Sequence, residues 1–94
     1  MKLMFSKRHP SIEGHFPGNP VVPAVTILAE LMAWAESETG RRVTGVKSAR
    51  FRSALHPEVC WTAEMEERSG ETLGITCSDQ GRVTMSAKLI LERS

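Results

Sequence analysis

The chain has 94 residues, which suffices for one domain and leaves no room for a separate cofactor-binding module. Hydrophobic residues make up 40% and charged residues 24%, a balance that is typical of soluble globular proteins and excludes a disordered or fibrous chain. The formal net charge is +1 and the basic residues are scattered, so nucleic acid is not an expected partner. We therefore expect a single domain over residues 1–94.

The first ten residues predict a short opening strand at Leu3-Met4-Phe5, which Arg8-His9-Pro10 ends. Charges return before the apolar core of a signal peptide could develop. The longest apolar stretch, residues 21–35, is interrupted by polar residues and is too short to span a bilayer. We expect a cytoplasmic protein that does not enter the membrane.

Residues 10–23 predict a rigid, shaped loop, because no helix or central strand tolerates their density of proline and glycine. They include Pro10, Gly14, Pro17, Gly18, Pro20 and Pro23.

A helix is predicted from Pro23 to about Ser37, with Pro23 at its first position and Gly40 as its stop signal. Apolar residues at spacings of three and four form one stripe, and others widen it. The stripe comprises Val25, Leu28, Ala29, Met32 and Ala35, widened by Ile27, Leu31 and Trp34. Only a narrow polar edge of Thr26, Glu30 and Ser37 remains, so we expect a helix that is buried on most sides.

The remaining chain predicts four strands, over residues 42–54, 60–66, 72–78 and 83–91. Short polar turns at 69–71 and 79–81 indicate an antiparallel meander. In the last strand, one face is expected to carry Val83, Met85, Ala87, Leu89 and Leu91. This strand would leave an apolar edge, so a small chain of this kind is expected to form a dimer or a higher even oligomer.

The two cysteines, Cys60 and Cys77, have no spacing that suggests a metal site. Two free, buried thiols in a reducing cytosol are the expected state, and a disulfide is the alternative. Glu64, Glu66 and Glu67 are expected on an exposed face, and no metal cluster is expected elsewhere.

One segment carries a recognisable motif: Gly14-His15-Phe16-Pro17-Gly18-Asn19-Pro20-Val21-Val22-Pro23-Ala24-Val25. It resembles the motif of the hotdog-fold dehydratases that act on 3-hydroxyacyl thioesters in fatty-acid and aryl-polyene synthesis. The resemblance extends to the helix and to the next strand, Val46 to Arg52. It implies an α+β hotdog fold, in which an antiparallel sheet wraps one long buried helix, and a double-hotdog dimer with two shared active sites.

The resemblance also implies an activity, the conversion of 3-hydroxyacyl thioesters on the phosphopantetheine arm of an acyl carrier protein to trans-2-enoyl thioesters, without a cofactor. His15 takes the role of the base, for which a neutral imidazole is suited. A backbone carbonyl near Val21 would fix its tautomer. The N–H of Ala24, at the start of the helix, would bind the thioester oxygen. Phe16 and Pro23 are expected to line the substrate site.

The sequence departs from the family at the catalytic acid, which the family places fourteen residues after the histidine. That position holds Ala29, and Glu30 follows it, about 100° around the helix. Either a small shift of the helix lets Glu30 serve as the acid, or Glu30 is a solvated carboxylate and the site has lost its acid. Glu13, close to His15, is a further candidate acid.

Alternative interpretations remain for the function and for the histidines. The same fold hosts acyl-thioesterases, and a subunit that has lost its acid could bind an acyl carrier or a partner without catalysis. His15 could instead be a turn histidine held by its neighbours. His9 and His56, each followed by a proline, are expected at the surface.

Overall fold

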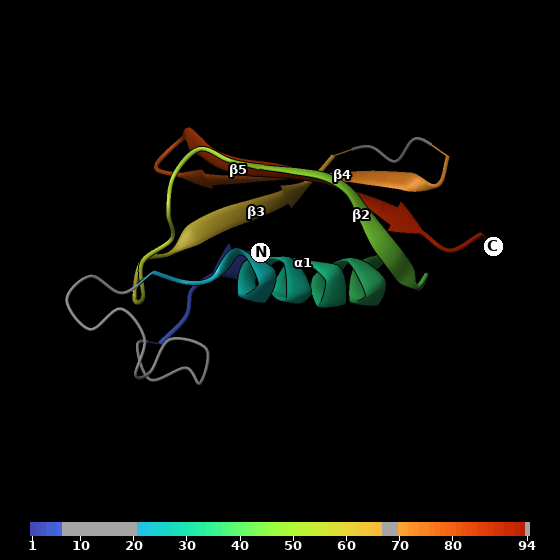
Figure 1. Ribbon diagram of the computed structural model, residues 1–94, viewed down its shortest axis with the longest axis horizontal. Helices are drawn as coiled ribbons and strands as arrows, with labels where there is room; N and C mark the ends of the chain where they lie inside the picture. The colour runs from blue at the N-terminus through green and yellow to red at the C-terminus, as the bar shows by residue number, and fades with distance from the viewer. Residues whose placement is uncertain (7–20, 67–69, 94) are drawn as a thin grey trace.

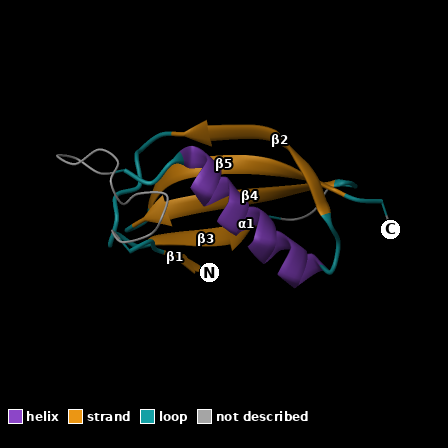
Figure 2. Cartoon of the chain, turned by 60° about the horizontal axis from the view of Figure 1, so that its bottom comes forward, coloured by secondary structure: helices purple, strands orange, loops and turns teal. Residues whose placement is uncertain are grey.

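The computed structural model describes residues 1–6, 21–66 and 70–93. They form β1 (Lys2–Leu3), α1 (Ala24–Thr39), β2 (Val43–Phe51), β3 (Trp61–Met65), β4 (Thr72–Asp79) and β5 (Arg82–Leu91), as Figure 1 shows. The strands build one antiparallel sheet in the order β1-β3-β4-β5-β2, and α1 lies across one face of it (Figure 2). One helix on one antiparallel sheet is the α+β arrangement that the sequence predicts.

The boundaries of α1 follow the local signals in the sequence. Pro23 occupies the N-cap, with φ −59° and ψ 143°, so the helix begins at Ala24, one residue later than expected; it continues to Thr39, two residues past the expected end. Gly40 closes it in the left-handed conformation, with φ 71°, and its N–H donates a hydrogen bond of 2.9 Å to the Glu36 carbonyl. The described part of the chain holds no helix long and apolar enough to cross a membrane.

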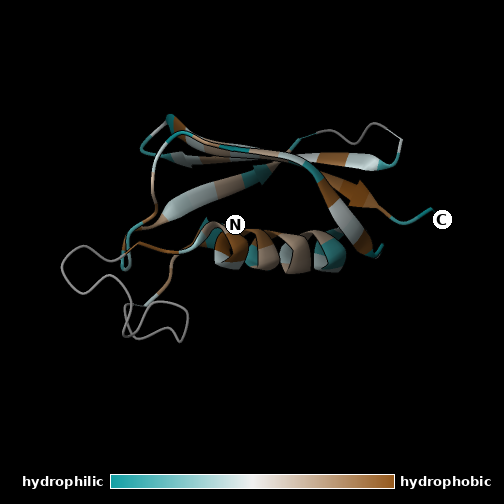
Figure 3. Cartoon of the chain, viewed as in Figure 1, coloured by the Kyte–Doolittle hydropathy of each residue, from teal (hydrophilic) through white to brown (hydrophobic). Residues whose placement is uncertain are grey.

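The helix is less enclosed in the single chain than the sequence predicts. Its buried stripe is Ile27, Leu31 and Ala35, whereas Val25, placed on the expected stripe, is 73% exposed. Leu28, Met32 and Trp34 are half-buried and pack against the core at either side of that stripe. The sheet covers one side of α1 only, because it curves around the helix from a single face (Figure 2). Figure 3 shows that hydrophobic residues nevertheless run along most of α1.

The predicted meander holds for β3, β4 and β5, which are neighbours in sequence order. Strand β2, shorter than expected at both ends, lies beside β5, with Ala49 opposite Ala87 and Phe51 opposite Met85. The last strand is therefore interior to the sheet, and the expectation that it forms an apolar edge is wrong. The long open edge belongs to β2 instead.

A two-residue turn joins β4 to β5 as the sequence predicts, with positive φ values of 52° at Gln80 and 82° at Gly81. Just after it, the register shifts: Val83 pairs with Ser78 and Met85 with Cys77, so Thr84 is an extra residue. Thr84 is therefore buried and Val83 is 42% exposed, so Val83 does not share the inner face as expected. From Met85 onward, the predicted inner face is correct.

The opening strand is Lys2–Leu3 rather than Leu3 to Phe5, and it pairs with the start of β3. Leu3 and Phe5 are nonetheless buried in the core, as are Trp61, Leu73 and Leu89 from the sheet. Both cysteines are free. Cys77 is buried, as expected, but Cys60 is exposed because it precedes β3 in the loop that follows β2.

Candidate functional site

A pocket of about 380 Å³ lies at the start of α1. We call it the helix-start pocket. It is formed between the residues that lead into the helix, the first helical turns, and the segment that follows β2. The residues that line it are Val21, Val22, Ala24, Ile27, Phe51, Arg52, Ser53, Ala54 and Leu55.

Backbone hydrogen bonds fix the two walls of the helix-start pocket against each other. The Val22 N–H donates to the Leu55 carbonyl at 2.8 Å, which ties the entry of α1 to the loop after β2. The Thr84 carbonyl accepts from the N–H groups of Arg52 and Ser53, at 2.8 and 3.2 Å. The extra residue in β5 therefore holds the end of β2 in the position where it lines the pocket.

The first turn of α1 presents free backbone donors at this pocket. The Pro23 carbonyl accepts the N–H groups of Thr26 and Ile27, at 3.0 and 3.2 Å. Pro23 itself has no N–H, and no described residue accepts the N–H of Ala24 or Val25. Such donors carry the partial positive charge of a helix N-terminus, so Ala24 is suited to hold a carbonyl oxygen that gains negative charge.

Glu30 does not line the helix-start pocket. It is exposed, and together with Ala29 it lines a second pocket of about 380 Å³ on the side of α1 that the sheet leaves open. Phe5, Val25 and Thr26 complete that pocket. Within one chain, the candidate acid and the candidate oxyanion donor therefore face different hollows.

The candidate residues thus fall into three groups. The structure brings Val21 and Ala24 together, with Pro23 between them at the N-cap. It places Glu30 apart from them. His15 and Phe16, like His9 and Glu13, lie outside the described residues. Among the residues described, no group of histidine, cysteine, aspartate and glutamate side chains could hold a metal ion.

Sequence reasoning missed the contribution of the segment after β2. Phe51, Arg52 and Ser53 line the helix-start pocket although they follow Ala24 by almost thirty residues. The expected strand ran on to Ala54, which would have placed these residues in the sheet. The strand ends at Phe51, and the chain turns toward the helix. His56 is exposed, as expected.

A family model described as ApeI-like, ApeI dehydratase, matches residues 1–88 of this chain. Among curated relatives, the 3-hydroxyacyl-[acyl-carrier-protein] dehydratase FabZ of Chloroflexus aggregans is 30% identical over 95% of this chain and 67% of its own length. The FabZ of Bordetella pertussis is 32% identical over 93% of this chain and 66% of its own length. The chain therefore spans about two thirds of the length of these relatives.

Solved structures agree on the fold. The dehydratase heterocomplex ApeI:P from Xenorhabdus doucetiae contains a chain that superposes with a TM-score of 0.81 at 21% identity, covering 98% of this chain and 84% of that one. A chain in a crystal structure of a protein from Erwinia carotovora superposes with a TM-score of 0.80 at 20% identity, covering 97% of this chain and 79% of that one. At these identities the likeness shows the fold alone, and that fold is the hotdog fold.

Proposed function

The chain belongs to the ApeI-like dehydratase family, and on that basis we propose that it removes water from 3-hydroxyacyl thioesters carried by an acyl carrier protein. The observation that carries this proposal is the family match over residues 1–88, which spans the histidine motif, the helix and most of the sheet. The FabZ relatives bear the same activity in their names. We propose one hotdog domain over residues 1–94, acting in the cytoplasm.

In this proposal His15 is the base. Its neutral imidazole takes the proton from C2 of the substrate, the electron pair moves toward the thioester carbonyl, and the C3 hydroxyl leaves as water after receiving a proton. The products are a trans-2-enoyl thioester and water, and no cofactor is consumed. Val21 belongs to the same sequence motif as His15 and lines the helix-start pocket, which supports this pocket as the site of the reaction.

The Ala24 N–H would stabilise the thioester oxygen as it gains negative charge. It stands free at the first turn of α1 and opens to the helix-start pocket, which supports this role. Ala24 also carries a methyl group, so it would leave the substrate less room beside this N–H than a glycine would. Phe16 and Pro23 would complete the wall around the reacting carbons.

The proton for the leaving hydroxyl requires an acid, and Glu30 is the carboxylate on α1 nearest to the family's position. Within one chain Glu30 faces away from the helix-start pocket. A dimer in which a second copy covers the open side of α1 would bring Glu30 toward the partner's site. We therefore propose a homodimer, or a higher even oligomer, with two shared sites.

The decisive experiment assays dehydration of a 3-hydroxyacyl carrier-protein thioester by the wild-type protein and three variants. His15→Ala is expected to abolish turnover. If Glu30 is the acid, Glu30→Gln should lower the rate by about 10²–10⁴-fold, the usual contribution of such a group. If the acid is missing, Glu30→Gln should have little effect and Ala29→Glu should raise the rate.

Turnover that survives both His15→Ala and Glu30→Gln would overturn this assignment, because the motif would not be where the chemistry happens. Glu36→Gln is a suitable control on the same helix, since its carboxylate accepts the Val43 N–H at 2.9 Å, far from the helix-start pocket. It should leave the rate as it is.

A second candidate is a subunit that binds the acyl carrier or a partner protein and depends on that partner for acid catalysis. Ala29 favours it, because an alanine stands where the family has its acid. A chain of the same fold occurs in the dehydratase heterocomplex ApeI:P from Xenorhabdus doucetiae, which supports considering a partner protein. This second candidate would be supported if the protein alone bound the thioester without turnover and if a partner dehydratase restored turnover. Release of free acid instead of an enoyl thioester would identify a thioesterase.

A further inference from the structure

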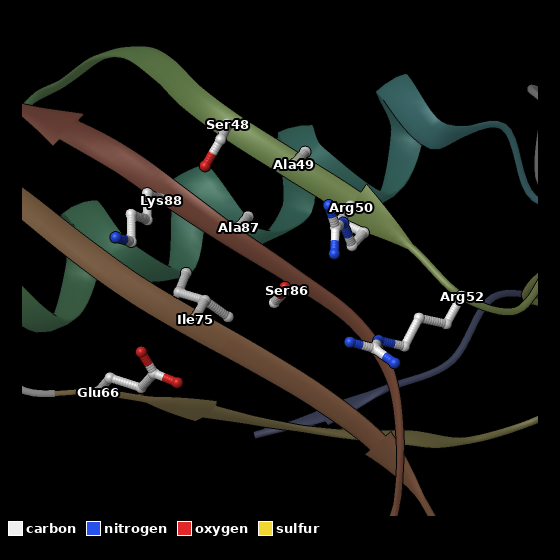
Figure 4. Close-up of a pocket in the computed structure, with 9 residues that line it drawn as sticks. All are labelled: Ser48, Ala49, Arg50, Arg52, Glu66, Ile75, Ser86, Ala87 and Lys88. Carbon is white, nitrogen blue, oxygen red and sulfur yellow. The ribbon is translucent and has the colours of Figure 1, made fainter.

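A further hollow lies on the outer face of the sheet, opposite α1. It has a volume of about 610 Å³. Figure 4 shows it between β2 and β3, with α1 behind the sheet. We call it the outer groove. Its lining residues are Ser48, Ala49, Arg50, Arg52, Glu66, Ile75, Ser86, Ala87 and Lys88.

The shape of the outer groove follows from the small residues at its centre. Lys88 pairs with Ser48 on one side and with Gly74 on the other. Gly74 has no side chain, and the Glu66 carboxylate lies over it, where an added Cβ would collide with Glu66 Oε2. Small side chains on β2 and β5 and a glycine on β4 therefore leave a shallow trough across the strands.

The charges of the outer groove are divided between its two borders. Arg50, Arg52 and Lys88 stand at the β2 and β5 border, as Figure 4 shows. Arg50 pairs with Ser86, and Lys88 lies two residues beyond Ser86 on β5. Arg50 and Lys88 are therefore diagonal neighbours, about 7 Å apart. On the opposite border, Glu66 accepts the Thr76 hydroxyl hydrogen bond at 2.6 Å.

The three cations have no acidic partner within the described residues, where the ion pair joins Arg93 to Glu71. They are exposed, and like charges held this close repel one another. Three cations that form no ion pair with a described residue outnumber the single carboxylate of Glu66 in this groove, so the β2 and β5 border has a positive potential that attracts an acidic surface.

Arg52 connects the outer groove to the candidate active site, because it lines both the outer groove and the helix-start pocket. A macromolecule seated on the β2 and β5 border would therefore contact Arg52, which also belongs to the wall of the helix-start pocket. Since these side chains lie on the outer face and not on the open edge of β2, joining two copies along that edge would leave them accessible.

We propose that Arg50, Arg52 and Lys88 form the docking surface for an acidic carrier protein that delivers its thioester arm into the helix-start pocket past Arg52. This inference rests on the proposed function and names the surface that recognises the partner. Rim charges act mainly on the rate of encounter, which depends on salt.

The test compares two substrates with the same acyl group, one attached to the acyl carrier protein and one to free pantetheine. The variants are Arg50→Glu and Lys88→Glu. The matched control is Arg42→Glu, an exposed cation just before β2, about 30 Å from Arg52 along the strand. The quantity measured is the ratio of kcat/KM for the carrier-linked substrate to kcat/KM for the pantetheine substrate.

We expect this ratio to fall about tenfold or more in each of the two variants and to stay constant in the control, with a smaller difference at high salt. An equal ratio in all three variants would overturn the proposal. The proposal would also be overturned if Arg50→Glu or Lys88→Glu changed the oligomeric mass but left the kcat/KM ratio unchanged, since a second copy of the chain would then occupy the outer groove.

A separate binding measurement distinguishes failure of the docking surface from failure of the proposed activity. If the wild-type protein turns over neither substrate, the proposed activity fails. A calorimetric titration of purified holo acyl carrier protein into this protein at low salt then tests docking alone. Binding that Arg50→Glu weakens and Arg42→Glu preserves would support the docking surface, and equal binding by all variants would refute it.

Discussion

Cys77 is the residue whose surroundings have the clearest chemical consequence. Its side chain is fully buried on the inner face of β4, and burial raises the pKa of its thiol from 9.0 to about 11. The thiol is therefore neutral in the folded protein at physiological pH. Reagents that attack thiolates should therefore modify the exposed Cys60 and leave Cys77 untouched until the protein unfolds.

The raised pKa of Cys77 also predicts a pH dependence of stability. The thiol of the unfolded chain ionises first as the pH rises, so the stabilising effect is complete below pH 9 and is lost as the pH approaches 11. The free energy of unfolding should fall by about 2–3 kcal/mol across this interval. Urea unfolding from pH 8 to pH 11 measures it. Cys77→Ala should flatten the profile, and Cys60→Ala should not; identical profiles would contradict the assignment.

At the scale of elements, the correct predictions are those that depend on local sequence signals. Gly40 stops α1 because a left-handed residue without a side chain satisfies the last carbonyls, and Gln80 with Gly81 makes the turn between β4 and β5. Such features depend on a few consecutive residues. They can therefore be read without knowledge of the rest of the molecule.

The features that were wrong depend on contacts between distant segments. Apolar residues occupy so much of α1 that the sequence alone does not fix which stripe faces the sheet, and Ile27 rather than Val25 is buried. The position of Thr84 as an extra residue breaks the two-residue period that the strand prediction assumed. The pairing of β2 with β5 follows from the closure of the sheet, which no local pattern encodes.

The same distinction applies to the candidate site. Val21 and Ala24 were predicted because they belong to one contiguous motif, and the structure brings them together. Arg52 reaches the helix-start pocket through the end of β2, and Glu30 turns out to face another hollow. The first fact depends on where β2 ends, and the second on how the helix is rotated over the sheet.

The helix stop provides a stability prediction for an element. Gly40 has φ 71° and open space around its position, so Gly40→Ala introduces strain without a clash. We expect it to lower the free energy of unfolding by about 1–2 kcal/mol, the cost of a left-handed alanine. Gly45→Ala is the matched control, since an added Cβ there meets only Ile90 Cδ1 at 3.8 Å, an ordinary contact. Equal effects in urea unfolding would show that the left-handed cap contributes nothing.

At the scale of the whole molecule, two surfaces of the single chain lack a partner in the described structure. The first is the free edge of β2, which exposes backbone groups over nine residues. The second is the open side of α1, where Val25, Ala29 and Ala33 follow one another at intervals of four residues and are all exposed. A small domain that leaves both surfaces to solvent gains stability by association. One dimer could cover both, which is why we place the second copy there.

The dimer prediction is tested by placing a charge on the open side of α1. Wild-type protein at micromolar concentration should sediment as a dimer or a multiple of it. Val25→Glu should raise the dissociation constant about tenfold or more, since a carboxylate buried without a partner costs at least the ~1.4 kcal/mol that a tenfold change represents. Val83→Glu is the matched control, because Val83 is an exposed valine in β5, within the sheet and not on the open side of α1, 42% accessible against 73% for Val25. It should leave the dimer intact. A wild-type monomer would refute the shared site as well, because Glu30 could then not reach the helix-start pocket of another copy.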